Sequence, residues 1–134
     1  MARYNRASGP PADFELTAAF QDVTGLSITR SWDDGEVLIS FTTSISNGTG
    51  LLVETDVRVL IDGQVQNLLF QSTTTPAGQF NTLTATAFLP LSEGSHTIKL
   101  QAGGNAAVGD VLLAGFTNLT VIQLPLWDSQ AGII

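Results

Sequence analysis

The sequence has no cysteine and a single histidine, His96. A chain without cysteine can form neither a disulfide framework nor a thiolate metal site. Metal-dependent enzymes of the cupin type need several histidines and a glutamate as ligands, which one histidine cannot supply. No apolar run approaches the ~20 residues of a membrane-spanning helix, so we expect no membrane partner. These absences favour a non-enzymatic protein without a cofactor.

Basic side chains are also scarce. Five Lys and Arg stand against 12 Asp and Glu, which gives a net charge of -7. Phosphate backbones are bound by clustered Lys and Arg, so the composition argues against a nucleic-acid partner. A chain of 134 residues suits one domain, which is large enough to bury a core without covalent staples.

Charged residues of both signs become rare after position 62. Residues 63–134 contain three acids and one base, which are Glu93, Asp110, Asp128 and Lys99. An average domain is about 25% charged, and depletion of charge is typical of the centre of a protein interface. This half of the chain is therefore either a neutral, Thr-rich β surface or a region that faces other protein chains. The apolar C-terminal tail favours the second interpretation.

What the sequence does contain is apolar residues at every second position, which is the period of a strand with one buried face. The alternation covers 14–20, 26–32, 37–44, 53–61, 65–73, 80–89, 95–102 and 117–124, with a weaker segment at 108–113. Asp62-Gly63, between two apolar segments, predicts a hairpin with a type I′ turn. No segment has the 3.6-residue period of a helix, so the pattern predicts an all-β sandwich or barrel.

The two ends of the chain differ from this body. Residues 1–12 include Ser8-Gly9-Pro10-Pro11, which can neither enter a sheet interior nor form a helix. We expect an N-terminal arm at 1–12, a β-sandwich at 13–125 and a C-terminal tail at 126–134. Disordered termini are the common alternative, but apolar tail side chains are costly to leave in water. We therefore expect partner contacts from six arm and tail residues, namely Arg3, Tyr4, Arg6, Trp127, Ile133 and Ile134.

Three short pieces of the chain carry a family resemblance. They are Val59-Leu60-Ile61-Asp62-Gly63, Gly94-Ser95-His96-Thr97-Ile98-Lys99-Leu100-Gln101 and Asn118-Leu119-Thr120-Val121-Ile122, the last two separated by a Gly-rich connection. In this order they resemble a jelly-roll domain that is common in bacteriophage virion proteins. The pattern is also similar to the trimeric complement and tumour-necrosis-factor-like jelly rolls.

The resemblance implies a homotrimer of antiparallel jelly rolls of about eight strands. In phage particles such domains serve as capsid decoration (cement) proteins or as parts of fibres and tail spikes. A decoration protein binds the major capsid protein on the outer surface of the virion and lays arms across subunit boundaries. The lack of a coiled-coil or β-helical stalk favours this role, and a receptor- or carbohydrate-binding jelly roll of a tail fibre or spike is the alternative. The last strand would supply the trimer interface, through Leu119, Val121, Ile122 and Leu124.

His96 is the first candidate for chemistry. It shares a strand face with Ile98 and Leu100, whereas its neighbour Ser95 points to the opposite face. A catalytic Ser–His pair needs both side chains within hydrogen-bond reach, so these two neighbours cannot form one. We expect a structural histidine that is hydrogen-bonded at the start of its strand.

Two further groups of residues have both a structural and a ligand-binding interpretation. Asp33, Asp34 and Glu36 could hold a calcium ion, but Asp-Asp-Gly is also good turn chemistry, and we expect a turn. Trp32 and Tyr4 could stack on a sugar, although packing in a core or interface is the usual role of such side chains.

Overall fold

The structure, a computed structural model, describes residues 3–104, 110–112 and 115–123. These residues form strands and no helix, so none of them belongs to a helix that could cross a membrane. The strands are β1 (Arg3–Ser8), β2 (Phe14–Glu15), β3 (Gln21–Trp32), β4 (Gly35–Asn47), β5 (Val53–Ile61), β6 (Gln64–Thr75), β7 (Phe80–Leu91), β8 (Gly94–Gly104), β9 (Asp110–Leu112) and β10 (Asn118–Gln123). Every pairing between them is antiparallel, which confirms the predicted all-β class.

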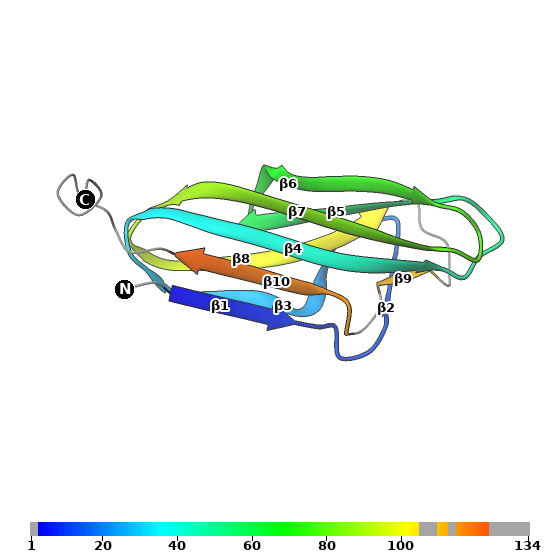
Figure 1. Cartoon of the computed structure of the whole chain (residues 1–134), viewed down its shortest axis with the longest axis horizontal. Helices are drawn as coiled ribbons and strands as arrows, with labels where there is room; N and C mark the ends of the chain where they lie inside the picture. Colours follow the sequence, from blue (N-terminus) through cyan, green and yellow to red (C-terminus); the bar gives the residue numbers. More distant parts are fainter. Residues whose placement is uncertain (1–2, 105–109, 113–114, 124–134) are drawn as a thin grey trace, which may run out of the picture.

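The strands form two sheets that lie face to face (Figure 1). In the six-stranded sheet, β4 pairs with β7 on one side and with β10 on the other, and β1 forms the edge beyond β10. The short strands β9 and β2 continue the β10 side of this sheet beyond the end of β10. The four-stranded sheet has the order β3-β8-β5-β6. The chain crosses between the sheets at each of the β3–β4, β4–β5, β6–β7 and β7–β8 connections, in a jelly-roll sandwich.

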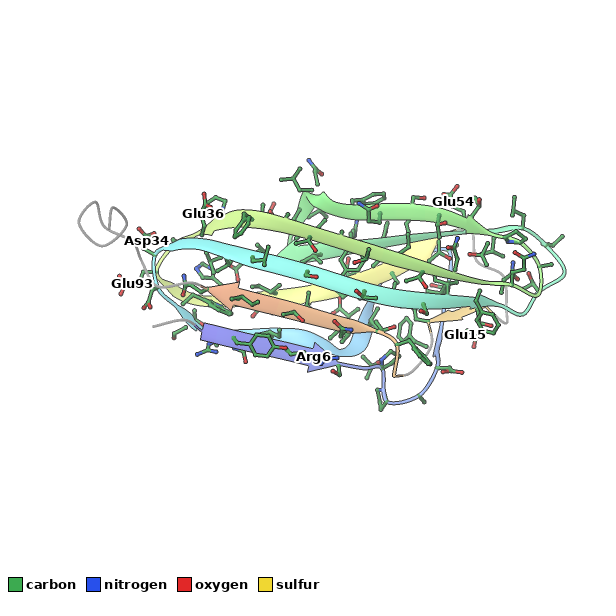
Figure 2. All side chains as sticks on the ribbon, viewed as in Figure 1. Arg6, Glu15, Asp34, Glu36, Glu54 and Glu93 are labelled. Atoms are coloured by element: carbon green, nitrogen blue, oxygen red, sulfur yellow. The ribbon has the colours of Figure 1, made fainter. Side chains whose placement is uncertain are left out.

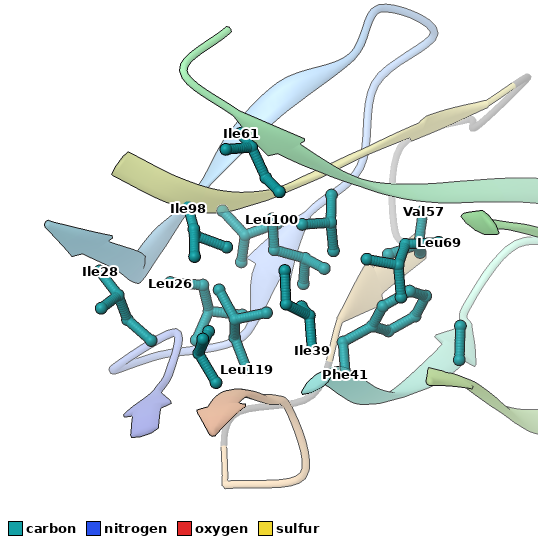
Figure 3. Close-up of a cluster of buried hydrophobic side chains, with 14 of the residues drawn as sticks. Leu26, Ile28, Ile39, Phe41, Val57, Ile61, Leu69, Ile98, Leu100 and Leu119 are labelled. Carbon is teal, nitrogen blue, oxygen red and sulfur yellow. The ribbon is translucent and has the colours of Figure 1, made fainter. Parts of the chain in front are cut away.

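The inward side chains of both sheets meet in one apolar core (Figure 3). On β4, buried Ile39 and Phe41 alternate with outward Leu38, Ser40 and Thr42, as the period of two requires. The facing sheet contributes further fully buried side chains, among them Leu26, Val57, Leu69, Ile98 and Leu100. Burying one such side chain contributes about 1.5–3 kcal/mol. The core fixes the register of each strand, because a slip of one residue would turn its apolar set toward water.

The β5–β6 hairpin confirms the predicted Asp62-Gly63 turn. Ile61 pairs with Gln64, and the two residues between them have φ angles of 50° and 81°. Positive φ at both central residues defines the type I′ turn, whose twist matches that of the strands it joins. The chain order Asp-Gly suits it because both residue types tolerate this left-handed region.

The N-terminal segment differs from the prediction. We expected residues 1–12 to form an arm outside the fold, but Arg3–Ser8 is a strand that pairs with β10 along its whole length. The physical reason is that β10 would otherwise present an open row of backbone donors and acceptors. The first residue of the predicted block, Ser8, is the last residue of this strand, and Gly9 then donates its N–H to the carbonyl of Thr117 at 3.2 Å. The prolines therefore end the strand and do not prevent it.

The predicted strand at 14–20 is also shorter than its alternation suggested. Only Phe14–Glu15 pairs, with β9, and the chain then turns. Leu16 is buried, but Ala18 and Ala19 are exposed, and the hydroxyl of Thr17 donates to the carbonyl of Ala19 at 3.0 Å. Such a local side-chain bond competes with the ladder of a sheet. The weak segment at 108–113 corresponds to β9.

Candidate functional site

The outer faces of the two sheets differ in charge. On the four-stranded sheet, the carboxylate of Asp22 accepts hydrogen bonds from Gln101 at 2.7 Å and from Lys99 at 3.1 Å. The Nε of Arg58 donates to Gln101 at 3.0 Å, which extends the network to a third strand. These bonds, first that of Gln101 and then that of Lys99, lower the pKa of Asp22 below its ordinary value. This face carries paired ions and suits contact with water.

The outer face of the six-stranded sheet carries few charges across its four main strands, among the side chains that the structure describes. On its four main strands β1, β10, β4 and β7, the ionised side chains described on this face are those of Arg6 and Glu36. Figure 2 shows Arg6 on β1 and Glu36 near one end of the sandwich. The face between them is built mainly of Ser and Thr. We refer to this surface as the sheet face.

One row of the sheet face is apolar on all four strands. The register pairs Tyr4 with Ile122, Ile122 with Leu38, and Leu38 with Phe88. Tyr4 and Phe88, at the two edges, are 59% and 57% exposed, and the two aliphatic residues between them are half-buried. Neighbouring strands are about 4.8 Å apart, so this apolar row is about 14 Å wide. Contiguous exposed apolar surface of this kind usually marks an interaction site.

The rows beside the apolar row are polar but already hydrogen-bonded. The hydroxyls of Thr42 and Thr84 lie 3.3 Å apart, as do those of Ser44 and Thr82. Thr84 also donates to the carbonyl of Phe41 at 3.0 Å. Hydroxyls that bond within the sheet lose little when another surface replaces water. The sheet face can therefore pack against protein.

Two of the residues that we expected at a trimer interface lie elsewhere. Leu119 and Val121 are 0% exposed and face the core between the sheets, so this assignment was wrong. Ile122 does lie outward, in the apolar row, while Leu124 is outside the described residues. Adjacent residues on β10 point to opposite faces, and the sequence alone does not say which face is covered by the second sheet. The packing of the second sheet against β10 and the strands paired with it decides which of its two faces is buried.

Of the predicted arm and tail residues, some lie on β1 and the others are outside the described residues. Tyr4 and Arg6 lie on β1 and project from the sheet face. Arg3 begins β1 through its backbone pair with Gln123. Trp127, Ile133 and Ile134 are outside the described residues.

Sequence reasoning missed Leu38 and Phe88 as surface residues. Leu38 stands between buried Val37 and Ile39, so the apolar run at 37–39 already contained a residue on the second face. On β7, Phe88 occupies an outward position in a series whose earlier members are threonines. What was missing was the register that places these two side chains next to each other.

His96 is held by two turns at one end of the sandwich. Its Nδ1 lies 2.5 Å from Oδ2 of Asp62, and its Nε2 lies 2.7 Å from the carbonyl oxygen of Ser92. The carboxylate and the carbonyl both accept hydrogen bonds, so this environment favours the ring that is protonated on both nitrogens. Asp62, first of all, and then Ser92 raise the pKa of His96 above its ordinary value, while His96 and the amide of Thr97 lower that of Asp62. The predicted structural histidine at a strand start is confirmed.

The same geometry tests the enzymatic interpretation. The hydroxyl of Ser92 lies 3.3 Å from Nε2 of His96, so serine, histidine and aspartate do come together. A general base needs a free lone pair at Nε2, whereas here Nε2 lies closer to the Ser92 carbonyl, at 2.7 Å, than to the hydroxyl that it would activate. The constellation therefore resembles a catalytic triad in composition but not in hydrogen bonding.

The predicted acidic turn joins β3 to β4. The amide of Gln123 binds it in both directions, because Asp33 N–H donates to Oε1 at 3.0 Å and Nε2 donates to the Asp33 carbonyl at 2.6 Å. An open hollow of about 430 Å³ beside the turn is lined by Asp34, Gly35, Glu36, Pro90, Leu91 and Ser92. No group of three or more potential metal ligands occurs among the residues the structure describes.

The aromatic candidates for sugar stacking are separated. Trp32 is 1% exposed and belongs to the core, with the guanidinium of Arg30 at 5.0 Å from its ring centre. Tyr4 is exposed but lies in the apolar row. A buried indole cannot stack on a ligand, so the carbohydrate-binding alternative loses its main residue.

Comparisons with known proteins support the fold. A scan against protein-family models finds no match, and neither does a search of the curated proteins. Among solved structures, the Eiger TNF of S. frugiperda is 11% identical, with a TM-score of 0.61 over 95% of this chain and 98% of that chain. Murine APRIL is 14% identical, with a TM-score of 0.63 over 92% of this chain and all (100%) of that chain.

A viral structure has the same fold. In the T13 viral particle of infectious bursal disease virus, the similar chain is 10% identical to this one, with a TM-score of 0.64. The match covers 90% of this chain but 31% of the viral chain. At these identities the comparisons show a shared jelly-roll sandwich and nothing beyond it.

Proposed function

We propose that this protein is a structural component of a virus particle: a homotrimer that decorates the outer surface of a phage capsid and stabilises the shell. The observation that carries the proposal is the sheet face, which has an apolar row across four strands and almost no charge. A monomer rarely leaves such a face in water. The similar structures include TNF proteins and a viral particle, which supports a capsid or trimeric role by analogy of fold.

A closed ring of three copies needs two different surfaces on each copy. The sheet face is one of them. The second is the edge strand β6, where Val65, Leu68 and Phe70 are 39%, 67% and 39% exposed. In the proposed trimer, this edge of one copy packs on the apolar row of the next. Charged residues of the four-stranded sheet then stay in solvent.

The C-terminal residues make the capsid contact in this proposal. Tyr4 and Arg6 lie on the sheet face and so belong with the subunit interface. Of the four remaining predicted contacts, Arg3 begins β1, while Trp127, Ile133 and Ile134 have apolar side chains that gain about 1.5–3 kcal/mol each on burial. They suit an apolar surface on the major capsid protein.

The oligomeric state is the first test. Sedimentation velocity on the purified chain should show a species of three times the chain mass of 14.1 kDa. A stable monomer at concentrations above those in a virion preparation would overturn the proposal.

Binding to the shell is the second test. Trp127→Ser and a deletion of 126–134 should leave the trimer intact and reduce occupancy on undecorated phage shells. Trp127→Phe, which keeps an aromatic side chain, is the matched control and should retain binding. Shell occupancy that is unchanged by the deletion would refute the role of the tail.

A further inference from the structure

Large apolar side chains gather at the end of the sandwich where β4 passes into β5 and β6 passes into β7. Leu51 and Leu52, in the β4–β5 connection, are 67% and 61% exposed, and Phe80, which begins β7, is 70% exposed. Figure 1 shows both connections at the right-hand end of the molecule, and backbone hydrogen bonds join them. We refer to residues 47–52 and 76–80 as the tip.

One buried side chain holds the two connections of the tip together. Asn47 is 2% exposed, and its Nδ2 donates to the carbonyls of Leu51 at 2.8 Å and of Thr75 at 2.6 Å. Its backbone N–H donates to the carbonyl of Gln79, and its carbonyl accepts from the N–H of Gly78, each at 3.0 Å. The loops are therefore fixed in the free protein, so little ordering is left to pay for when they bind.

The polar groups beside Leu51 are bonded within the tip. The N–H of Leu51 donates to Oγ1 of Thr49 at 3.2 Å, and its carbonyl accepts from Asn47. The N–H and the hydroxyl of Thr49 donate to Oδ1 of Asn47 at 3.0 and 2.9 Å. A polar group that is already paired loses no hydrogen bond when water is withdrawn. Leu51 can therefore leave water without exposing an unpaired backbone group.

The tip itself carries no charge. Its connections belong to two stretches, 37–53 and 63–92, that contain no Asp, Glu, Lys, Arg or His. Two acids flank it, because Glu54 follows the β4–β5 connection on β5 (Figure 2) and Asp110 is the register partner of Asn47. A negatively charged surface would be repelled by these acids, whereas an uncharged one would not.

The size of the tip distinguishes between partners. A large apolar side chain has at most about 250 Å² of surface, so three that are about two-thirds exposed offer at most about 500 Å². A stable protein interface buries about 800 Å² per partner and carries about one hydrogen bond per 100–200 Å². The tip is smaller, and the polar groups around Leu51 are bonded inward. A lipid surface requires neither a large matched area nor directed hydrogen bonds.

We propose that the tip is a membrane-contact site, at which Leu51, Leu52 and Phe80 enter the boundary between headgroups and acyl chains of an uncharged lipid bilayer. The lack of a long apolar run, from which we expected no membrane partner, does not bear on loops that enter only this boundary. The last described strand ends at the other end of the sandwich, where Gln123 binds the β3–β4 turn. In the proposed virus particle, the tip therefore points away from the shell.

Flotation with phosphatidylcholine vesicles tests the proposal on the purified chain. The wild type should float with these vesicles, and adding phosphatidylserine should lower the bound fraction. Phe80→Ser should lower the partition coefficient about tenfold, and Leu51→Ser with Leu52→Ser about a hundredfold. Phe116→Ser is the matched control, since Phe116 is 63% exposed in the turn before β10, and it should bind like the wild type.

A fluorescence measurement locates the contact. Phe80→Trp should keep binding, and phosphatidylcholine brominated in the acyl chains should quench its emission more than that of Phe116→Trp. A wild type that does not float, equal partition of wild type and Phe80→Ser, or equal quenching of the two tryptophan variants would overturn the proposal. Sedimentation velocity on the same samples keeps this result separate from the proposed function, because a trimer that ignores vesicles refutes the membrane contact alone.

Discussion

Replacing Phe88 by Thr should dissociate the proposed trimer without damaging the subunit. Phe88 is 57% exposed, and its strand already carries Thr82, Thr84 and Thr86 on the same face, so threonine keeps the β propensity and the pattern. Full burial of such a side chain contributes about 1.5–3 kcal/mol. The part still exposed in the subunit therefore contributes about 1–1.5 kcal/mol when a second copy covers it.

A closed trimer has three equivalent interfaces, and each contains this contact. The substitution therefore removes the contribution of Phe88 three times. The sum is about 3–4.5 kcal/mol per trimer, which lowers the association constant by about two to three orders of magnitude. Because that constant depends on the square of the concentration, the midpoint of dissociation should rise by about 10–40-fold. Sedimentation velocity over a dilution series measures this midpoint.

Phe116→Thr is the matched control. Phe116 is of the same type and is 63% exposed, but it lies in the turn before β10 and outside the sheet face. The Phe116→Thr variant should leave the midpoint of trimer dissociation unchanged. Equal midpoints for wild type and Phe88→Thr, with both folded by circular dichroism, would refute the assignment of the sheet face.

Three other predictions concern the subunit itself. Gly104→Ala should destabilise the fold by more than about 2 kcal/mol in chemical denaturation, because φ is +148° and a Cβ would overlap the backbone carbonyl of Glu54. Deleting residues 1–8 should lower the melting temperature and promote aggregation, since it uncovers the paired edge of the sheet; an unchanged melting curve would restore the view that the segment is a free arm. Asp62→Asn should cost about 0.5–1 kcal/mol of unfolding free energy near pH 6, reduced by solvent screening at the exposed carboxylate, and the loss should vanish at both extremes of pH. The raised pKa of His96 gives stability that is complete below about pH 6.5 and lost as the pH rises through the folded value, and the lowered pKa of Asp62 gives stability present above about pH 4 and lost on further acidification.

Local chemistry predicted much of the structure. The Asp62-Gly63 turn formed as expected because these two residues tolerate the positive φ angles of a type I′ turn without help from distant segments. The face of β8 that carries His96, Ile98 and Leu100 was also predicted correctly, since adjacent residues of a strand always point to opposite sides. Proline was a weaker guide, because Pro10 and Pro11 lie outside a strand but did not exclude one at Arg3–Ser8, and Pro90 lies within β7.

In the fold, charge depletion follows one sheet face and does not follow one half of the chain. We attributed it to the second half of the sequence, whereas the structure shows it as a property of one sheet face. That face combines β1 and β4 from the first half with β7 and β10 from the second. The charged β8 belongs to the second half and lies in the other sheet, where Lys99 pairs with Asp22.

The amino-acid order alone determined the strand class, the tightest turn and the alternation of each segment, because these depend on a residue and its neighbours within a few positions. The three-dimensional pairing decided which side of each strand meets the core, which made Leu119 a core residue and Ile122 a surface residue. It also brought Tyr4 beside Ile122, and Leu38 beside Phe88, from four separate strands. Register between distant segments is set by the burial of both sheets together, and no single segment contains that information.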